Sequence, residues 1–478
     1  MPEIKNTFAQ GKMNKDLDER LIPNGQYRHA LNVSVDISDG SDVGAIENIK
    51  GNTRIDSFLQ GSNSENTPLI VGPYTCVGSI IDEANDVFYW FISSPNVDAI
   101  AQYNEATGVS SFVAVDIAGQ STDPDIERFL NFTGKPITAI NIIDNFIFWT
   151  DGDNEPKRIN VDHLEKLTNT DQHSRLYVDG EDKGFIKEEH VTVIRKKPSI
   201  APSFKINTSE NTGRKPIFEK IFPRFSFRYK YRDGEYSAFA PFTDVVFNPE
   251  YVGTNNEFNT YTIDEPYNKA MVNSISSIEL YNFVPSDIPA DVVQVDLLYK
   301  QENSPIVYSL ANIKYTDPEW QIDGYAGNIS GATTAHKGYY NITTENVRAA
   351  VPENQTLRPY DNVPKTAVAQ EIVANRLVYA NYTQGYDIEG SLAVNCDVEL
   401  RQDQDFTNGG QRSIKSLRDY QVGVVFGDEY GRETPVFTSG SANTQINWSG
   451  NFGLNASSSL MLNANVDLDT PSWAKYYK

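Results

Sequence analysis

The sequence repeats one phrase three times: VGSIIDEANDVFYWFIS at residues 77–93, ITAINIIDNFIFWTDGD at 137–153 and AVAQEIVANRLVYANYT at 367–383. Each copy begins with an apolar run, passes through a short turn and ends in an aromatic-rich run. The turns carry Asn85, Asn145 and Asn375, and Asn tolerates the left-handed backbone of a tight hairpin better than most residues. A hairpin repeated in this way predicts a β-propeller blade or another repetitive β-architecture, and it favours a scaffold over a catalytic pocket.

Each hairpin contributes an adjacent pair of residues in its second strand to the expected core of a blade. Because successive side chains of a strand point to opposite faces, one member of each pair should face inward and be buried. The pairs are Phe88 and Tyr89, Phe148 and Trp149, and Val378 and Tyr379.

Further strand-like runs surround the first two hairpins. Residues 77–116 contain VGSIID, VFYWFIS, AIAQYN and VSSFVAVD, separated by short turns. Four antiparallel strands joined in this way are what one blade requires. Residues 137–162 contain three more runs, and HVTVIRKK from His190 is the candidate fourth. Only about three blades are recognisable, whereas a closed ring has roughly four to eight, so we expect the others to be divergent or to lie beyond Lys478.

The pattern changes near Pro202. FPRFSFRYKYRDGEYSAFAPF from Phe222 predicts a strand, an Asp-Gly hairpin and a strand, and the long strands that follow are typical of a β-sandwich similar to fibronectin type III. YQVGVVFGDEYGRETPVF from Tyr420 corresponds to FSFRYKYRDGEYSAFAPF, and the final SWAKYYK corresponds to VDLLYK. In the first copy the strand IVYSLANI comes next. The second copy stops before it, which would leave an open sheet edge, so we expect the natural polypeptide to continue.

These patterns predict an all-β chain in which a β-propeller carries inserted and appended β-sandwich domains of fibronectin or immunoglobulin type. No long amphipathic helical stretch is present, so helix should account for less than about a fifth of the residues. The expected parts are an N-terminal assembly segment at 1–26, the first part of the propeller at 27–200, an inserted sandwich at 201–345, the returning part of the propeller at 346–395 and a second, incomplete sandwich at 396–478.

Charge and cysteine content narrow the functional classes. The 478 residues include 41 Lys plus Arg and 64 Asp plus Glu, a formal charge of −23, and so acidic a chain should not hold nucleic acid by neutralising phosphates. Solubility alone explains such a surface; the sharper interpretation is a surface that repels a polyanion. Cys76 and Cys396 indicate neither a disulfide framework nor a metal site. With no apolar signal segment and no membrane-length apolar run, we expect synthesis in a reducing cytoplasm and no membrane insertion.

The sequence offers no catalytic, cofactor-binding or metal-binding set. Asp151, Asp153 and Asn154 invite a calcium loop but lack its further oxygen ligands, so a hairpin turn is the better interpretation. The five His residues show no metal-ligand spacing, and nucleophile-elbow, P-loop and dinucleotide-binding patterns are missing. We therefore expect no enzyme activity and no cofactor. The basic run at residues 195–197 is expected to end a strand at a domain junction, with an isolated phosphate contact as the alternative.

The N-terminal phrase is densely charged but has no amphipathic pattern. One interpretation is a flexible tail; the other is an assembly segment that becomes ordered against a neighbouring subunit. The residues that would serve in assembly are Lys12, Asp16, Asp18, Arg20 and Tyr27.

Three phrases resemble a known family. GKMNKDLDERLIPNGQYRHALNVSV from Gly11, GSDVGAIENIKGN from Gly40 and IFWTDGDNEPKRIN from Ile147 are similar to the tail nozzle or muzzle proteins of crAss-like and related short-tailed bacteriophages. These proteins are also called tail stabilisation or tail tubular proteins. NRLVYANYTQGYD, YQVGVVFGDEYGRE and PSWAKYYK support the resemblance later in the chain, whereas residues 200–360 carry little of it.

The resemblance implies a structural protein of the virion tail, assembled as a homohexamer on a β-propeller with added sandwich domains. It would form the distal channel below the portal and ring proteins, with other tail proteins and tail fibres as neighbours. DNA and ejected proteins would pass through without specific binding, and an acidic lumen suits such a conduit because phosphate contacts add up to tight binding. The family has no catalytic residues to carry over, and its members are longer than this chain.

Two other classes stay open at this point. A receptor-binding or glycan-binding adhesin of the propeller-plus-sandwich type would place an aromatic cluster on exposed loops. A propeller glycosidase would gather carboxylates at the propeller axis, although paired carboxylates are plentiful in any chain this acidic.

Overall fold

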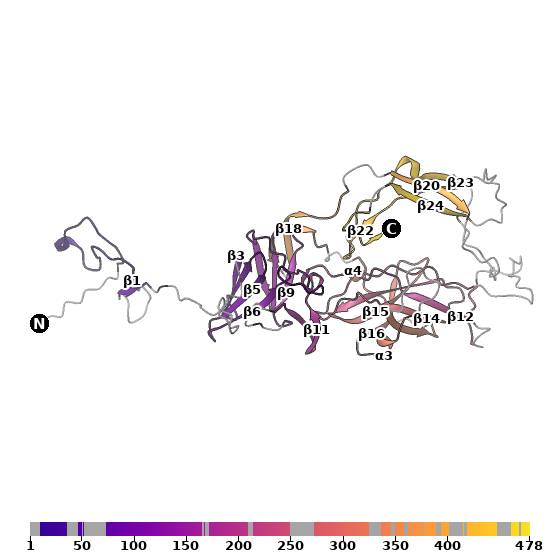
Figure 1. The fold of residues 1–478 in the computed structure, drawn as a ribbon, viewed down its shortest axis with the longest axis horizontal. Helices are drawn as coiled ribbons and strands as arrows, with labels where there is room; N and C mark the ends of the chain where they lie inside the picture. Colours follow the sequence, from indigo (N-terminus) through magenta and orange to yellow (C-terminus); the bar gives the residue numbers. More distant parts are fainter. Residues whose placement is uncertain are drawn as a thin grey trace, which may run out of the picture. The chain divides into compact units, whose positions relative to one another are not determined.

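The computed structural model describes residues 10–35, 46–49, 51, 73–164, 167, 172–208, 214–248, 272–324, 336–345, 349–357, 362–374, 376–388, 393–400, 414, 418–446, 460–467 and 470–478 (Figure 1). Among them about 5% of residues lie in helices and 46% in strands, which confirms the prediction of an all-β chain with little helix. No helix in these ranges is long and apolar enough to cross a membrane. The chain forms two compact units, Met1–Ser57 and Phe58–Lys478.

The described part of the first unit has little regular structure. It contains the 3-10 helix η1 (Glu19–Leu21) and the antiparallel strands β1 (Val33–Val35) and β2 (Ile46–Asn48). Backbone hydrogen bonds close the loop before β1: Asn14 N donates to Tyr27 O at 2.8 Å, and Tyr27 N donates to Lys12 O at 3.1 Å. Of the side chains described in this unit, no apolar one is buried. Backbone pairing therefore holds its described part.

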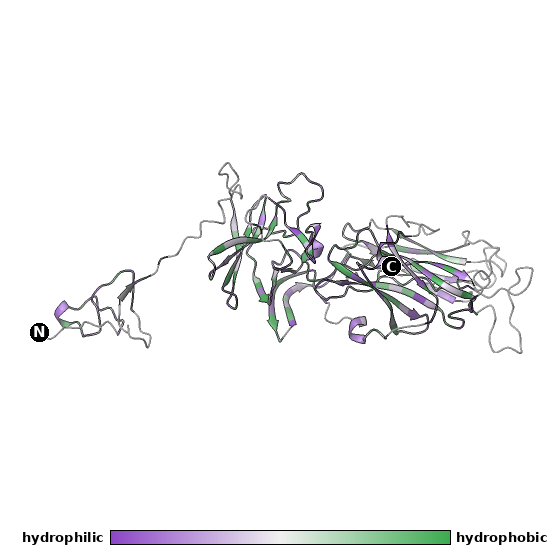
Figure 2. Ribbon diagram, turned by 90° about the horizontal axis from the view of Figure 1, so that it is seen from below, coloured by the Kyte–Doolittle hydropathy of each residue, from purple (hydrophilic) through white to green (hydrophobic). Residues whose placement is uncertain are grey.

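The repeated hairpins form three sheets of the second unit. The first is a four-stranded antiparallel meander, the second has three strands and the third has two, as the strand-like runs predict. Their strands are β3 (Thr75–Asp82), β4 (Val87–Ser93), β5 (Asp98–Asn104) and β6 (Val109–Asp116); β7 (Ala139–Ile143), β8 (Phe146–Thr150) and β9 (Lys157–Asn160); and β18 (Thr366–Val373) and β19 (Arg376–Thr383). Figure 2 shows hydrophobic and hydrophilic residues interspersed along the strands.

The hairpin turns take their left-handed residue beside the expected Asn. The residues with positive φ are Asp86, Asp144 and Ala374, at 52°, 49° and 45°. Asn85 and Asn145 do not have positive φ, so the prediction was wrong for these two turns; Asn375 lies outside the described residues. Asp enters the left-handed region nearly as readily as Asn, which frees the two Asn amides to donate hydrogen bonds to nearby aspartates.

The first sheet contacts the second, and the second contacts the third. Between the first two, Phe91 of β4 meets Trp149 of β8 edge-on, with ring centroids 5.6 Å apart, inside one buried cluster. At the opposite side of the second sheet, the hydroxyls of Thr138 and Thr150 donate to backbone carbonyls of β18. All sheets in the described part of the chain are open, and none closes on itself.

The stretch from His190, the candidate fourth strand of the second sheet, is not a strand. It begins with α1 (Glu188–Val191) and continues irregularly, making a single antiparallel bridge from Thr192 to Lys157. Val191 and Ile194 are buried in two different clusters. Their apolar character therefore reflects passage between β-units. Another hairpin, β10 (Arg175–Val178) and β11 (Glu181–Phe185), precedes α1.

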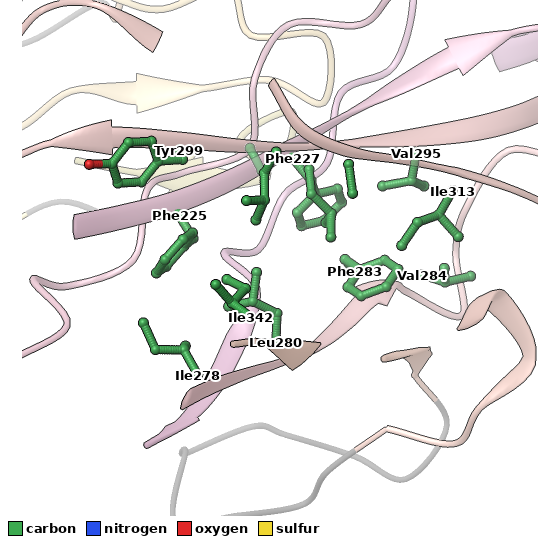
Figure 3. Close-up of a cluster of buried hydrophobic side chains, with 14 of the residues drawn as sticks. Phe225, Phe227, Ile278, Leu280, Phe283, Val284, Val295, Tyr299, Ile313 and Ile342 are labelled. Atoms are coloured by element: carbon green, nitrogen blue, oxygen red, sulfur yellow. The ribbon is translucent and has the colours of Figure 1, made fainter. Parts of the chain in front are cut away.

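Two three-stranded antiparallel sheets share the next core. They are β12 (Ser203–Thr208), β14 (Ile275–Val284) and β17 (Lys337–Ile342), and β13 (Pro223–Tyr231), β15 (Val292–Gln301) and β16 (Val307–Lys314), with α3 (Pro318–Gln321) between β16 and β17 and α4 (Glu353–Leu357) after β17. Figure 3 shows how side chains of both sheets converge, such as Phe225 and Phe227 from β13 with Leu280 and Phe283 from β14. All four are fully buried, at 0% exposure.

The run after the Asp-Gly turn follows β13 without becoming a regular strand. Ser237, Ala240 and Thr243 donate backbone hydrogen bonds to β13 residues two apart, at 2.9, 2.8 and 2.8 Å. The donors are three residues apart, whereas their acceptors on β13 are two residues apart. The segment after the turn therefore has one extra residue at each step, which is a repeated β-bulge. The hairpin turn itself is present, with Gly234 at φ 83°.

The C-terminal part contains three two-stranded sheets around a small cluster that includes Val394, Val424 and Phe426. Their strands are β20 (Ala393–Leu400) with β24 (Leu460–Asp467), β21 (Arg418–Gln421) with β23 (Asn443–Ile446), and β22 (Phe426–Gly427) with β25 (Tyr476–Tyr477), and the 3-10 helix η3 (Gly440–Ala442) precedes β23. The chain end pairs with the strand before the second hairpin, much as β15 pairs with β13. The registers differ, however: Phe426 pairs with Tyr477, whereas its counterpart Tyr231 pairs with Val292, so SWAKYYK does not take the place predicted from VDLLYK.

Candidate functional site

The IFWTDGDNEPKRIN phrase forms a tight turn between β8 and β9. Asp151 Oδ1 accepts the backbone N–H groups of Asp153 at 2.9 Å and Asn154 at 2.8 Å, and the Asn154 amide donates to Asp151 Oδ2 at 2.7 Å. The Asp151 carboxylate, which the sequence had suggested as a calcium ligand, instead accepts hydrogen bonds within the turn. Within the described ranges, no group of three or more His, Cys, Asp or Glu side chains is placed to hold a metal ion.

The strand after this turn carries two buried cations that point in opposite directions. Lys157 is 1% exposed, and its ammonium donates to Phe129 O at 2.5 Å and to Glu188 Oε1 at 2.7 Å. It therefore ties β9 to the segment before β7 and to α1. Its neighbour Arg158 lies on the other face of β9.

Arg158 and Arg195 form a buried ionic cluster with the hairpin after β13. Arg158 donates from Nη1 to Glu235 Oε1 at 2.9 Å and from Nη2 to Asp233 Oδ2 at 3.2 Å. Arg195 Nη2 donates to the same Asp233 oxygen at 2.7 Å, and Arg195 Nη1 lies 3.3 Å from Asp291 Oδ2. Except for Glu235, each of these side chains is less than a tenth exposed. We call this cluster of Arg158, Arg195, Asp233, Glu235 and Asp291 the ionic joint.

Strong electrostatic coupling holds the ionic joint together. Burial by itself lowers the pKa of Arg195, but the carboxylates of Asp291, Glu235 and Asp233 outweigh burial and raise that pKa above its ordinary value. Burial raises the pKa of Asp291, whereas Arg195 acts to lower it. Removing one partner would leave an uncompensated buried charge. The joint thus fastens the second repeated sheet to the sheet of β13 and β15.

The remaining members of the basic run also belong to junctions. Lys196 Nζ donates to Glu189 Oε2 at 2.9 Å, and Lys197 Nζ donates to Tyr476 Oη at 2.9 Å. Burial lowers the pKa of Lys197 to about 8, and the charge of Lys478 acts in the same direction. The run contacts the hairpin after β13, α1 and β25, all within the second unit, and it does not end a strand, so that part of the prediction was wrong.

A second joint connects the turn between β8 and β9 to the C-terminal part. Arg432 donates from Nε to Asp428 Oδ2 at 2.7 Å and from Nη2 to Glu155. The Arg432 guanidinium also lies 5.7 Å from the ring centroid of Tyr386. In the correspondence between the two hairpins, Asp428 occupies the position of Asp233. Both copies therefore use one acidic position to hold an arginine at a junction.

Comparison with protein families identifies the relatives of this chain. The model of the family described as Crassvirus muzzle protein matches residues 3–271, more than half of the 478 residues. The chain belongs to the Crassvirus muzzle protein family. Membership confirms the resemblance seen in the sequence and supports a structural role in the bacteriophage tail and a non-enzymatic chain. No curated protein matches the sequence.

The region matched by the muzzle family contains most of the ionic joint. Arg158, Arg195, Asp233 and Glu235 lie inside residues 3–271, while Asp291 lies outside them. Sequence reasoning missed the joint because its members are far apart: Arg158 and Glu235 are 77 residues apart. The usable signal was the acidic residue shared by the two corresponding hairpins.

The six residues predicted to form the blade cores are not equally buried. Tyr89 and Trp149 are 5% and 1% exposed. Phe88, Phe148 and Tyr379 are half-buried, and Val378 is 48% exposed. In every pair the second residue is the more buried one. The inward position of the repeat is therefore that of Tyr89, Trp149 and Tyr379.

The predicted assembly residues lie mostly at the surface of the first unit. The side chains of Lys12, Asp16, Asp18 and Arg20 are exposed, and Tyr27 is half-buried. Asp18 has a local role that the charge pattern did not reveal, because its Oδ1 accepts the backbone N–H of Arg20 at 3.0 Å and caps η1. The assembly role of these five residues remains a prediction.

Two buried carboxylates that the sequence analysis did not single out face each other across β5 and β6. Asp98 and Asp116 are register partners and are 1% and 2% exposed. Asp116 Oδ2 accepts the backbone N–H groups of Phe129 at 2.7 Å and Leu130 at 3.1 Å, and Asp98 Oδ2 accepts that of Phe132 at 3.1 Å. A carboxylate pair of the kind that a glycosidase would use is here engaged in holding a backbone turn whose side chains fill the core.

We expect Asp98→Asn to become more stabilising as pH rises. Burial raises the pKa of Asp98 from 3.8 to about 6, and the nearby Asp116 adds to the rise. A folded-state pKa above the unfolded value gives stability that is present below about pH 4 and lost as pH rises through 6. Because Asn stays neutral, its advantage over the wild type should grow by up to about 3 kcal/mol between pH 4 and 8.

Denaturant unfolding of both proteins at several pH values measures this difference. Glu105→Gln, on the exposed turn after β5, is the control for simple loss of a charge. A difference between Asp98→Asn and wild type that does not vary with pH would contradict the role given to the carboxylate.

Proposed function

We propose that this protein forms the distal nozzle or muzzle channel of the phage tail, through which the genome and ejected proteins pass. The family match over residues 3–271 carries the proposal. Within this proposal, the three repeated sheets are blades of a β-propeller, residues 201–345 are the inserted sandwich, and residues 396–478 are the second sandwich. Buried ionic joints between these parts suit a conduit that must stay rigid while its cargo moves.

Electron microscopy tests this function directly. Antibody labelling of purified virions should place the protein at the distal end of the tail, and negative-stain images of the purified chain should show rings with a central hole, with six subunits. Labelling on the capsid, or particles without a hole, would contradict the channel and favour the adhesin.

The first unit is the proposed assembly element, through which subunits or the portal and ring proteins are held. Several of its described apolar side chains are open to solvent: Leu21 is 68% exposed, Leu31 76% and Ile49 58%. A small unit that exposes leucines gains stability by covering them against a partner. The dense surface charge of Lys12, Asp16 and Arg20 would then set the orientation of that contact.

Deleting residues 1–20 should leave a folded second unit that assembles poorly. The deletion removes one partner of each backbone hydrogen bond that closes the loop before β1, but none of the clusters of the second unit. Light scattering should report mainly monomer, with an unchanged melting temperature for the second unit. Leu21→Ser and Lys12→Ser then separate the apolar contribution from the charged one, and normal rings from the deletion protein would disprove the assembly role.

We also expect no measurable binding of double-stranded DNA, even at low salt. The net charge is −23, and the basic run that might have gripped phosphates is engaged in ion pairs and hydrogen bonds with Asp233, Glu189 and Tyr476. A gel shift at low micromolar protein that weakens steeply with added salt would show instead that the channel grips its cargo.

A further inference from the structure

A small cavity lies within the ionic joint. Its volume is about 30 Å³, and its polar wall includes Arg158, His190, Arg195, Arg232, Asp233 and Asp291. Apolar side chains, among them Phe146 and Val191, complete the wall. At roughly 10–15 Å³ per molecule, the cavity has room for two or three waters.

Four polar atoms in this wall have no hydrogen-bond partner in the protein. They are Arg158 Nε, His190 Nε2, Asp233 Oδ1 and Asp291 Oδ1. Their side chains are 4–9% exposed. The nearest approach, His163 Nδ1 to Asp233 Oδ1 at 3.4 Å, is too long for a good hydrogen bond. Buried polar groups of this kind are nearly always satisfied by some partner.

The protonation state of His190 decides whether its Nε2 atom is a hydrogen-bond donor or an acceptor in the cavity wall. Burial lowers the pKa of His190 to about 4, so the ring is neutral at physiological pH. Its Nδ1 accepts the backbone N–H of Lys187 at 3.0 Å, which leaves the proton on Nε2. The wall therefore offers two donors, Arg158 Nε–H and His190 Nε2–H, and two acceptors, Asp233 Oδ1 and Asp291 Oδ1.

We infer that the cavity binds an ordered water molecule that bridges these four atoms and completes the ionic joint. Water is the ligand whose chemistry matches, because it accepts two hydrogen bonds and donates two. An anion would face the two carboxylates of Asp233 and Asp291, and a cation would face the three guanidinium groups of Arg158, Arg195 and Arg232. The water links β9 and α1 to the β13 hairpin and the loop before β15, and this inference stands whether or not the channel function holds.

Crystals of the full chain at a resolution that shows ordered water, grown in sodium chloride and in sodium bromide, test the inference. We expect an oxygen-sized peak within about 3 Å of at least three of the four atoms, and no anomalous bromide signal in the cavity. A bromide signal would establish an anion site, and direct pairing of the four atoms without a peak would establish a dry joint. Either result overturns the proposal.

A variant pair at His190 adds a second measurement. His190→Gln keeps a donor that can reach the cavity and should keep the solvent peak, whereas His190→Leu should weaken or remove it. An equally strong peak in His190→Leu would show that the histidine does not bind the water. If either variant fails to fold, the wild-type maps decide the question alone.

Discussion

Replacing Arg195 by leucine is expected to lower the free energy of unfolding by about 3–5 kcal/mol, because removing one partner of a buried ionic group leaves the others uncompensated. The Arg195 side chain is 5% exposed and lies within 3.3 Å of Asp233, Glu235 and Asp291. Arg158 alone would then face all three carboxylates. Loss of the second unit's stability should appear as a lower melting temperature and a lower denaturant midpoint.

Two further variants show whether stability depends on the planar guanidinium group of Arg195 or only on its charge. Arg195→Lys keeps the charge but cannot donate to Asp233 and Asp291 from separate nitrogens of a planar group, so it should fall between wild type and leucine. Lys135→Ala removes a surface pair with Asp153, 2.6 Å apart, in which Lys135 is 65% exposed, and should cost at most about 1 kcal/mol. If Arg195→Leu cost no more than Lys135→Ala, the ionic joint would not be what holds the parts together.

Local patterns predicted the strands of this chain because strand formation leaves a local signature. The short apolar run VGSIID and the aromatic-rich run VFYWFIS, with a polar turn between them, are enough to define β3 and β4. The same rule failed at HVTVIRKK, where the apolar residues cover two different clusters, and at SAFAPF, where bulges and Pro241 prevent a regular ladder.

The joints could not be predicted in this way, since they depend on which distant residues meet. Arg432 and Glu155 are 277 residues apart, and no periodicity relates them. Each is an ordinary charged residue in a chain with many. The paired carboxylates of Asp98 and Asp116 were equally invisible, because an acid at a strand end usually indicates a solvated turn. Their burial becomes evident only in the structure, where the two carboxylates accept hydrogen bonds from backbone N–H groups of a distant segment.

The repeat itself makes a prediction about which face of each repeated sheet is buried. Trp149→Ala should cost about 3–5 kcal/mol, the range for truncating a fully buried aromatic side chain. Trp149 is 1% exposed and meets Phe91 and Phe132 edge-on, with centroids 5.6 and 6.4 Å away. Its removal would leave a cavity at the contact between the first two sheets, where neither backbone can collapse without breaking its own ladder.

The adjacent residue is the matched control. Phe148→Ala removes a half-buried ring from the opposite face of β8, so it should cost clearly less, and Val378→Ala, at a 48% exposed site, should change stability by roughly 0.5 kcal/mol or less. Thermal unfolding of the three variants ranks the positions. Equal losses for Trp149→Ala and Phe148→Ala would mean that both faces of β8 are equally packed, and the inward position assigned to the second residue of each pair would have to be abandoned.

We expect the loss of stability to be largest for Trp149→Ala, smaller for Phe148→Ala and smallest for Val378→Ala. This order would show that the sheets gain their stability from the face that each turns toward its neighbour. That is the arrangement required of blades that stack in series.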